Sequence, residues 1–215
     1  MTLQLDHLVV AARTLDDGAA WCEATLGIVP GAGGTHALMG THNRLFRVAS
    51  DAFERAYFEI IAIDPAAPPP GRARWFGLDG IDLSRGPRLV NVVARTPSLD
   101  ATLAALRDAG VDAGRALAAS RATPSGLLQW RIAVRDDGRV LHGGALPTLI
   151  EWGERHPADA MPASGVTLQA LTLRGLPQAV VAALDFQGVT VADSAGPALT
   201  ARLHTPRGTI DLATD

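Results

Sequence analysis

Short apolar runs and amphipathic stretches alternate along the chain, and their order recurs. Residues 5–12 form an apolar run typical of a buried strand, and residues 14–26 follow as a capped helix. Residues 88–95 and 101–109 repeat this strand and helix, and the two copies align without a gap. A weaker third copy spans residues 168–186. The recurrence predicts an internal structural repeat.

Each predicted helix is followed by turn-punctuated segments that indicate three more strands. The last strand of each copy carries one acidic residue in an apolar setting: Glu59, Glu151 and Asp211. A carboxylate buried in such a strand costs several kcal/mol unless it is paired, hydrogen-bonded or bound to a metal. The shared position therefore predicts a shared purpose.

The pattern predicts an α+β fold of consecutive βαβββ modules. We expect one domain over residues 1–160, with modules at 3–64 and 87–153, and a third, shorter module at 163–215. Proline- and glycine-rich tracts lie between the modules and favour connections rather than strands.

The amino-acid composition excludes several classes of protein and of catalytic chemistry. The 215 residues are 47% hydrophobic and carry a net charge of −3, without the basic face of a nucleic-acid-binding protein. No apolar run is long enough for a membrane span and no leader pattern is visible, so we expect a cytoplasmic protein. Cys22 is the single cysteine and lysine is absent, which excludes disulfides within the chain and Schiff-base chemistry. Histidine, carboxylate and metal chemistry remain.

Four short motifs resemble the vicinal oxygen chelate superfamily, and within it the glyoxalase-like proteins. They are Leu-Asp-His-Leu-Val-Val at 5–10, Gly-Thr-His-Asn-Arg-Leu at 40–45, Tyr-Phe-Glu at 57–59 and Leu-Ile-Glu-Trp-Gly at 149–153. The resemblance implies that the first two modules pair into a half-open barrel. It also implies that a divalent metal inside the barrel is held by first and fourth strands.

Carried over by position, the resemblance assigns His7, Glu59 and Glu151 as metal ligands, with Asn91 at the fourth position. Such a set suits Zn, Mn, Fe, Ni or Mg. Glu59 or Glu151 would act as the catalytic base next to a carbonyl. The implied function is metal-assisted lyase or isomerase chemistry on a small molecule with vicinal oxygens.

Asn91 departs from the family pattern, because an amide oxygen is a weak, neutral ligand where many members place His, Gln or Glu. The alternative function is therefore a non-catalytic protein that binds or sequesters a small molecule without metal. In that case His7, Asn91 and Glu59 satisfy one another by hydrogen bonds.

Other polar residues are candidates for substrate binding. His36 and His42 flank a glycine-containing turn that we place at the barrel mouth; we expect His36 and Asn43 to line the pocket, the alternative being an ordinary surface loop. Asn91 and Arg131 complete the expected set. Trp152 is adjacent to Glu151, so we expect it to face the covering helices instead of the cavity. The tract Gly31 to Gly34 is interpreted as a loop.

The expected partner is a small molecule, with no nucleic acid and no membrane. An odd third module either caps the barrel or pairs with another chain, and a homodimer is expected.

Overall fold

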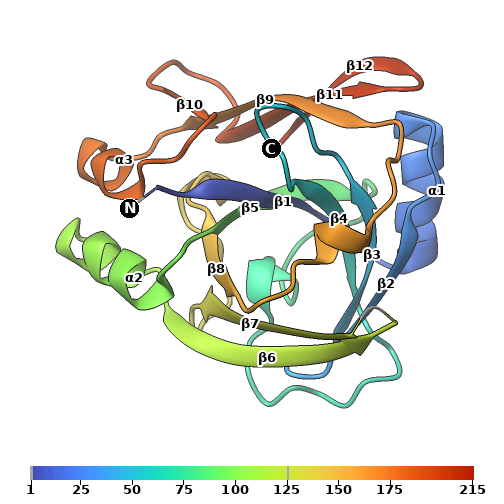
Figure 1. Ribbon diagram of the computed structural model, residues 1–215, viewed down its shortest axis with the longest axis horizontal. Coiled ribbons are helices and arrows are strands. Elements are labelled where there is room, and N and C mark those ends of the chain that lie inside the picture. Colours follow the sequence, from blue (N-terminus) through green and yellow to red (C-terminus); the bar gives the residue numbers. More distant parts are fainter. Residues whose placement is uncertain (1, 125) are drawn as a thin grey trace.

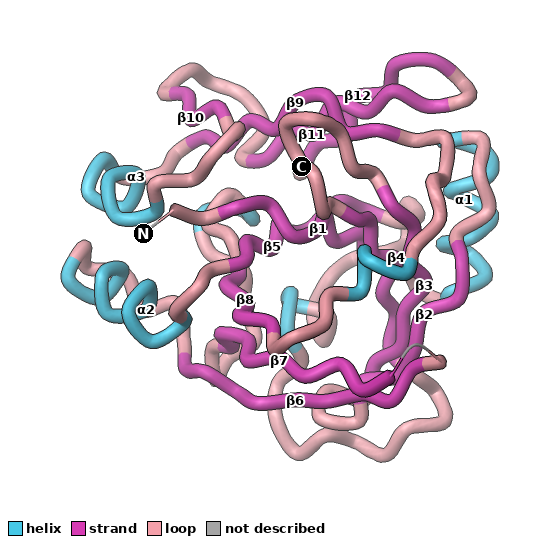
Figure 2. The backbone as a smooth tube through the Cα atoms, in the orientation of Figure 1, coloured by secondary structure: helices cyan, strands magenta, loops and turns pink. Residues whose placement is uncertain are grey.

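The computed structural model describes residues 2–124 and 126–215 and has the predicted α+β architecture (Figures 1 and 2). The first module contains β1 (Gln4–Ala11), α1 (Leu15–Leu26), β2 (Gly31–His36), β3 (Thr41–Arg47) and β4 (Tyr57–Ile63). The second contains β5 (Arg88–Arg95), α2 (Leu99–Asp108), β6 (Arg115–Thr123), β7 (Gly126–Val134) and β8 (Thr148–Trp152). The third contains β9 (Thr167–Arg174), α3 (Gln178–Leu184), β10 (Thr190–Ala192), β11 (Leu199–Thr205) and β12 (Gly208–Ala213). Three short 3-10 helices lie in the connections: η1 (Trp75–Gly77), η2 (His142–Gly144) and η3 (Pro157–Ala160).

The first two modules share one eight-stranded sheet in the order β2-β3-β4-β1-β5-β8-β7-β6. Within each module the first strand lies parallel to the last, and the modules meet where β1 runs antiparallel to β5. The sheet curls so far that its two end strands, β2 and β6, come into contact (Figure 1). This is the half-open barrel that the family resemblance implies.

The first helix shows why the sequence pattern located the elements well. Thr14 caps α1 by accepting a hydrogen bond from the Asp17 amide at 3.0 Å. Gly27 ends the helix in the left-handed conformation, with φ of 76°. Both signals are local, so they are readable from sequence alone.

The third module keeps the order of elements but not the strand pairing. Its sheet runs β10-β9-β11-β12, so β9 lies between β10 and β11, whereas β1 is parallel to the last strand of its own module. Asp211 lies exposed on the edge strand β12 and is paired with Arg202 at 2.8 Å. The acid of the third copy therefore has no positional relation to Glu59.

The apolar face of the third module packs on the outer face of the barrel sheet. Leu168, Leu171 and Leu203 join one continuous core with Leu8 and Phe58. The module thus covers the back of the barrel and leaves the mouth open. The homodimer is expected on the ground that the third module must bury its apolar face. Because that face is buried within one chain, it gives no such reason for pairing, and the homodimer stays a prediction.

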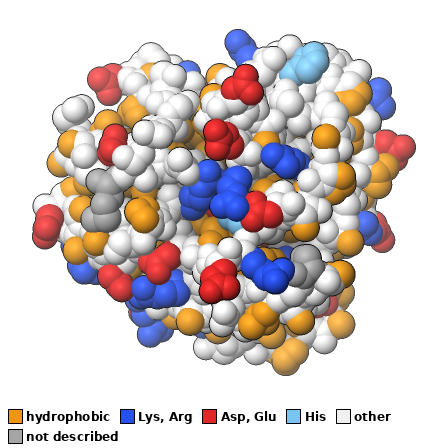
Figure 3. Space-filling view, in the orientation of Figure 1, with side chains coloured by type: hydrophobic (Ala, Val, Ile, Leu, Met, Phe, Trp, Pro, Cys, Tyr) orange, Lys and Arg blue, Asp and Glu red, His pale blue; other side chains and the backbone are white. Residues whose placement is uncertain are grey.

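A second apolar cluster fills the inside of the barrel. It includes Val9, Ile61, Trp130 and Ile150, all buried. None of the helices in the described part of the chain has the length and apolarity needed to cross a bilayer. Acidic and basic side chains are interspersed over the face in Figure 3, with a small basic group near its centre.

The tract from Gly31 to Gly34, interpreted from sequence as a loop, belongs to strand β2; Gly31 and Ala32 pair with β3, and Gly33 and Gly34 lie in a register shift of that pairing. Glycine disfavours strands, which is why the pattern was misleading. A Cβ atom on Gly33 would lie 2.2 Å from both the backbone and the side-chain oxygen of Asn43. The missing side chain is therefore what allows β2 to lie so close to Asn43.

Candidate functional site

A pocket inside the barrel is lined by side chains that can act as acids, bases or hydrogen-bonding groups. Its empty volume is about 420 Å³, including open solvent at the mouth. Polar residues from both modules line it: His7, His36, Asn43, Tyr57, Glu59 and Arg121. Aromatic side chains, among them Trp75, Trp130 and Trp152, form much of the remaining wall. Apolar walls with a few convergent polar groups are typical of small-molecule sites.

His7 and Glu59 form the polar centre of this pocket. They lie on the neighbouring parallel strands β1 and β4, where His7 is beside Tyr57 and Val9 is beside Glu59. Since residues two apart on a strand share a face, both side chains point into the barrel. His7 Nε2 is 3.5 Å from Glu59 Oε2, and the His7 ring stacks on Tyr57 with 4.5 Å between centroids. The sequence prediction that these two residues meet is confirmed.

Asp6 is a site residue that sequence analysis missed. Leu5 pairs with Ala94 and His7 with Val93, so Asp6 is the extra residue of a β-bulge. The bulge lets two successive side chains approach each other, and His7 Nδ1 lies 2.7 Å from Asp6 Oδ1. The available signal was an acid next to a histidine inside an apolar run.

Asp6 is completely buried and has partners on both carboxylate oxygens. Trp152 Nε1 donates to Asp6 Oδ2 at 2.8 Å, and His156 Nε2 lies 2.9 Å from the same oxygen. The His156 Nδ1 atom accepts from the Ala158 amide, so its Nε2 carries the proton and donates to Asp6. Hydrogen-bond donors thus surround this carboxylate, and they stabilise its charged form.

The buried charges shift the protonation of the whole cluster. Burial raises the pKa of Asp6, but hydrogen bonds from His156 and His7 outweigh it and hold that pKa well below its usual range. Burial lowers the pKa of His7, yet hydrogen bonds to Asp6 and Glu59 raise it to about 9. Burial also opposes the charged form of Glu59, and the hydrogen bond from His7 nevertheless lowers its pKa. At neutral pH the pocket therefore contains imidazolium and carboxylate side by side.

These shifts predict a stability maximum near pH 6.5. The raised pKa of His7 stabilises the fold fully below 6.5, and this contribution disappears as the pH rises through about 9. Burial lowers the pKa of His36 to about 4, so stability also falls as the pH decreases from 6.5 towards 4. We expect a loss on the order of 2–3 kcal/mol between pH 6.5 and 9, measured by urea unfolding. A His7→Asn variant should lack this alkaline decrease, whereas exposed His204→Asn should keep it; a wild-type curve flat over that range would contradict the prediction.

His36 and Asn43, predicted to bind substrate, do line the pocket. Asn43 Nδ2 donates to Glu59 Oε1 at 2.6 Å, and Asn43 Oδ1 accepts from the Gly34 amide at 2.8 Å. His36 Nδ1 lies 3.1 Å from the Thr41 hydroxyl, and its Nε2 is 3.3 Å from Asn43 Nδ2. Both residues lie on strands, β2 and β3, instead of the predicted loop. Asn43 orients the Glu59 carboxylate.

Glu151, Arg131 and Asn91 do not line the pocket. Glu151 Oε2 accepts from the Leu99 amide at 2.6 Å, at the start of helix α2 on the outer face. Arg131 binds both carboxylate oxygens of Asp100, at 2.7 and 2.9 Å. Asn91 is buried and donates to the carbonyls of Gly144 and Leu146, at 3.1 Å each.

The register of β8 explains why Glu151 and Glu59 point to different faces. In the repeat alignment Val93 corresponds to Val9; Glu59 lies beside Val9, whereas Thr148 lies beside Val93. Thr148 is thus the structural counterpart of Glu59, and Glu151, three residues later, points outward. Trp152 correspondingly faces the cavity, opposite to its prediction, and its ring lies 5.5 Å from Trp130.

The second module therefore carries a neutral pair where the first carries a charged one. Thr148 donates to Asn91 Oδ1 at 2.7 Å, and these two residues take the places of Glu59 and His7. Among residues 2–124 and 126–215, no three His, Cys, Asp or Glu side chains are arranged to hold a metal ion. His7 and Glu59 are only two donors, and Glu59 Oε1 is already bonded to Asn43. The donor set does not fit the three-ligand site that the resemblance implies.

A Glu151→Gln variant separates these two acids. We expect it to lower the free energy of unfolding by about 0.5–1 kcal/mol, because the helix loses a negative charge at its positive end. Urea denaturation measures this loss. Ligand binding in the pocket should stay at the wild-type level, and a substantial loss of it would show that Glu151 acts on the site.

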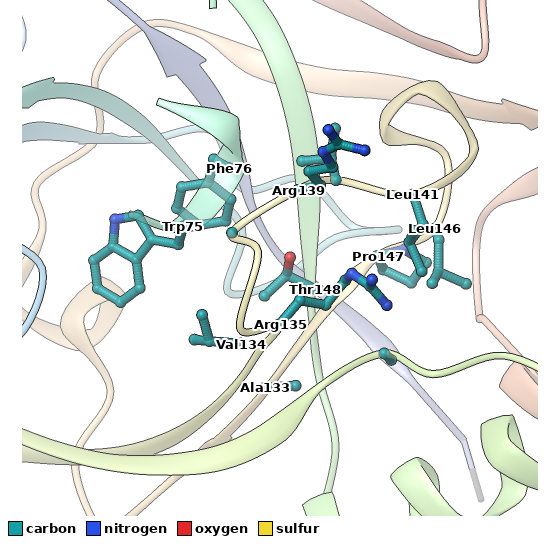
Figure 4. A pocket seen from close by; sticks show the side chains of 13 residues that line it. Trp75, Phe76, Ala133, Val134, Arg135, Arg139, Leu141, Leu146, Pro147 and Thr148 are labelled. Atoms are coloured by element: carbon teal, nitrogen blue, oxygen red, sulfur yellow. The ribbon is translucent and has the colours of Figure 1, made fainter. Parts of the chain in front are cut away.

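A neighbouring pocket shares the walls made by η1 (Figure 4). Trp75 and Phe76 lie on one side of it, and Leu141, Leu146 and Pro147 on the other. Phe76 has a φ of 58°, which is rare for a residue with a bulky side chain. This strained turn places two adjacent aromatic rings along the walls of both pockets.

Comparison with known proteins identifies the family. A family model described as a glyoxalase-like domain matches residues 5–187. Among curated proteins, none matches the chain. A hypothetical protein from Staphylococcus aureus has a similar structure, with a TM-score of 0.59, 14% identity and coverage of 98% of this chain and 86% of that one.

Two methylmalonyl-CoA epimerases are also similar in structure. The Streptomyces coelicolor enzyme has a TM-score of 0.44 and 16% identity over 69% of this chain and 95% of its own. The Mycobacterium tuberculosis enzyme has a TM-score of 0.42 and 21% identity over 69% of this chain and 86% of its own. From the family match, which covers most of the chain, we conclude that the chain belongs to the glyoxalase-like domain family.

Proposed function

We propose that the chain is an enzyme that moves a proton next to the carbonyl group of a small molecule, as an isomerase or lyase does. The observation that carries this proposal is the buried pair of His7 and Glu59 in a pocket with aromatic walls. A carboxylate is a suitable base for a carbon acid, and an imidazolium is a suitable acid for the carbonyl oxygen.

The two groups perform complementary halves of the reaction. Glu59 removes a proton from the carbon next to the carbonyl, while His7 donates its Nε2 proton to the carbonyl oxygen, so that an enol forms. Glu59 is then neutral acid and His7 neutral imidazole. Transfer of one proton from Glu59 to His7, whose atoms lie 3.5 Å apart, restores the starting state. No external acid, base or redox partner is required.

Asn43 and Asp6 support this chemistry without touching the reacting atoms. Asn43 fixes one oxygen of Glu59 and leaves Oε2 to act as base. Asp6 binds His7 Nδ1, which directs the acidic Nε2–H of His7 towards the pocket. Groups held in this way lose little free energy to reorganisation during the reaction.

The experiment is deuterium exchange in D₂O followed by proton NMR, with a panel of small aldehydes, ketones and oxo acids. We expect wild-type protein to accelerate loss of the signal next to a carbonyl in at least one class, and Glu151→Gln to do the same. If no compound exchanges faster than in protein-free buffer, the enzyme proposal fails.

The second candidate is a binding protein that sequesters a small molecule without converting it. It is favoured by the internal hydrogen bonds of the site, since His7 Nδ1 and Glu59 Oε1 already have partners within the chain. Saturable binding by a protein that catalyses no exchange would support this candidate.

A further inference from the structure

Among the described residues that line the pocket, Arg121 carries a charge that the mechanism above does not use. It extends from β6 of the second module towards the first, where its Nη1 lies 3.4 Å from Asn43 Oδ1. This is a long contact with a neutral group. Within the described part of the chain no carboxylate lies within ion-pair distance of Arg121.

The Arg121 side chain packs against Gly34 on strand β2, where no side chain is in the way. A Cβ atom on Gly34 would lie 2.5 Å from Arg121 Nη1 and 2.6 Å from its Cδ. The Arg121 side chain therefore lies directly against a bare backbone, which any larger residue at position 34 would displace. Its place beside Asn43 is set by the sequence of β2 as much as by its own strand.

Two buried N–H groups of residues that line this pocket lack a hydrogen-bond acceptor in the part of the chain described. They are Arg121 Nε and Trp75 Nε1. A buried donor without an acceptor costs free energy, and such groups are rare in folded proteins. Two of them on residues that line one pocket favour a ligand that brings oxygen acceptors.

The charges facing the pocket limit what that ligand is. His7 lies between the carboxylates of Asp6 and Glu59. Arg121 instead has a polar contact only with the neutral Asn43 among the described residues, so its guanidinium is the positive group left to pair with a ligand. One guanidinium matches a carboxylate in charge and in fork geometry, whereas a phosphate group brings nearly two negative charges. Walls made of aromatic rings favour a flat ligand body.

We propose that the pocket binds a small, flat monocarboxylate, with Arg121 holding the carboxylate and Trp75 Nε1 donating to an oxygen of the ligand. The substrate class of the reaction, a part of the inference that rests on the proposed function, is an aryl or otherwise unsaturated oxo acid. Its carboxylate lies on Arg121 and its carbonyl lies between His7 and Glu59.

Tryptophan fluorescence tests the binding directly, because Trp75, Trp130 and Trp152 line the pocket. Benzoate, neutral benzamide and phenyl phosphate are titrated into wild type, Arg121→Gln and the matched control Arg115→Gln, whose arginine is exposed on the same strand. We expect saturable quenching by benzoate, with benzamide binding about tenfold or more weakly. Arg121→Gln should lose that preference and leave benzamide binding unchanged, while Arg115→Gln should behave as wild type. Gly34→Ala should weaken benzoate binding as well, because it displaces Arg121.

The proposal is overturned if benzoate and benzamide bind wild type equally, if neither binds, if phenyl phosphate binds more tightly than benzoate, or if Arg121→Gln retains the preference. Binding and turnover are separated by repeating the titration with Glu59→Gln, which should still bind benzoate. Arg121-dependent binding without proton exchange refutes the proposed function and leaves this inference standing. If neutral ketones exchange at the same rate in wild type and in Arg121→Gln, the proposed function stands and this inference is refuted.

Discussion

A Glu59→Gln variant is expected to lose proton exchange by about 10²- to 10⁴-fold relative to wild type, the range typical for removal of a general base. Glutamine keeps the shape of the side chain, and its amide oxygen can still accept the hydrogen bond from Asn43. It cannot take a proton from carbon. The exchange rate measured by NMR should therefore fall while the protein still folds and the pocket keeps its form.

The control for this variant is Glu151→Gln, the same chemical change at the residue that the repeat aligns with Glu59. Glu151 contacts the Leu99 amide outside the pocket, so its loss should leave exchange unchanged. Equal loss in both variants would indicate an effect on folding. Undiminished exchange in Glu59→Gln would remove Glu59 from the mechanism.

The sequence predicted the elements of this fold better than the relations between them. Strands 88–95 and 148–152 were predicted with the bounds that the structure has, because apolar runs between turn residues are local signals. Which face Glu151 occupies depends on the register of β8 against β5, and no local pattern specifies that register. One register assumption accounts for the wrong predictions of both Glu151 and Trp152.

Two other features required three-dimensional contacts. The glycine tract of β2 is a poor strand by propensity, and the missing side chain of Gly33 is what lets β2 lie against Asn43. Asp6 belongs to the site because a bulge rotates it towards His7, whereas strict alternation would point it away. The sequence motifs therefore predicted the pocket residues His7, Glu59, His36 and Asn43, but not Asp6, whose place in the site depends on the bulge.

Asp6→Asn is expected to give the largest loss of stability among the single changes considered, about 3–5 kcal/mol in the free energy of unfolding. The wild-type carboxylate accepts from His7, Trp152 and His156; the bonds to His7 and His156 are buried and the bond to Trp152 is partly buried. Asparagine offers one acceptor oxygen, and its amide group turns a donor towards at least one of these donors. Asp211→Asn, which breaks an exposed pair with Arg202, should cost at most about 1 kcal/mol.

The same variant separates a structural role of Asp6 from an electrostatic one. If Asp6 holds His7 in its charged form, removing the charge must lower the pKa of His7 from about 9, and NMR titration of the imidazole measures that change. Should Asp6→Asn prove too unstable to study, Trp152→Phe removes one donor from the carboxylate while keeping both charges, and it should leave the pKa of His7 high. An unchanged pKa of His7 in Asp6→Asn would mean that Glu59 alone keeps the imidazole protonated. The acidity of the proton that His7 donates to the carbonyl oxygen would then be set by Glu59 inside the pocket and not by Asp6.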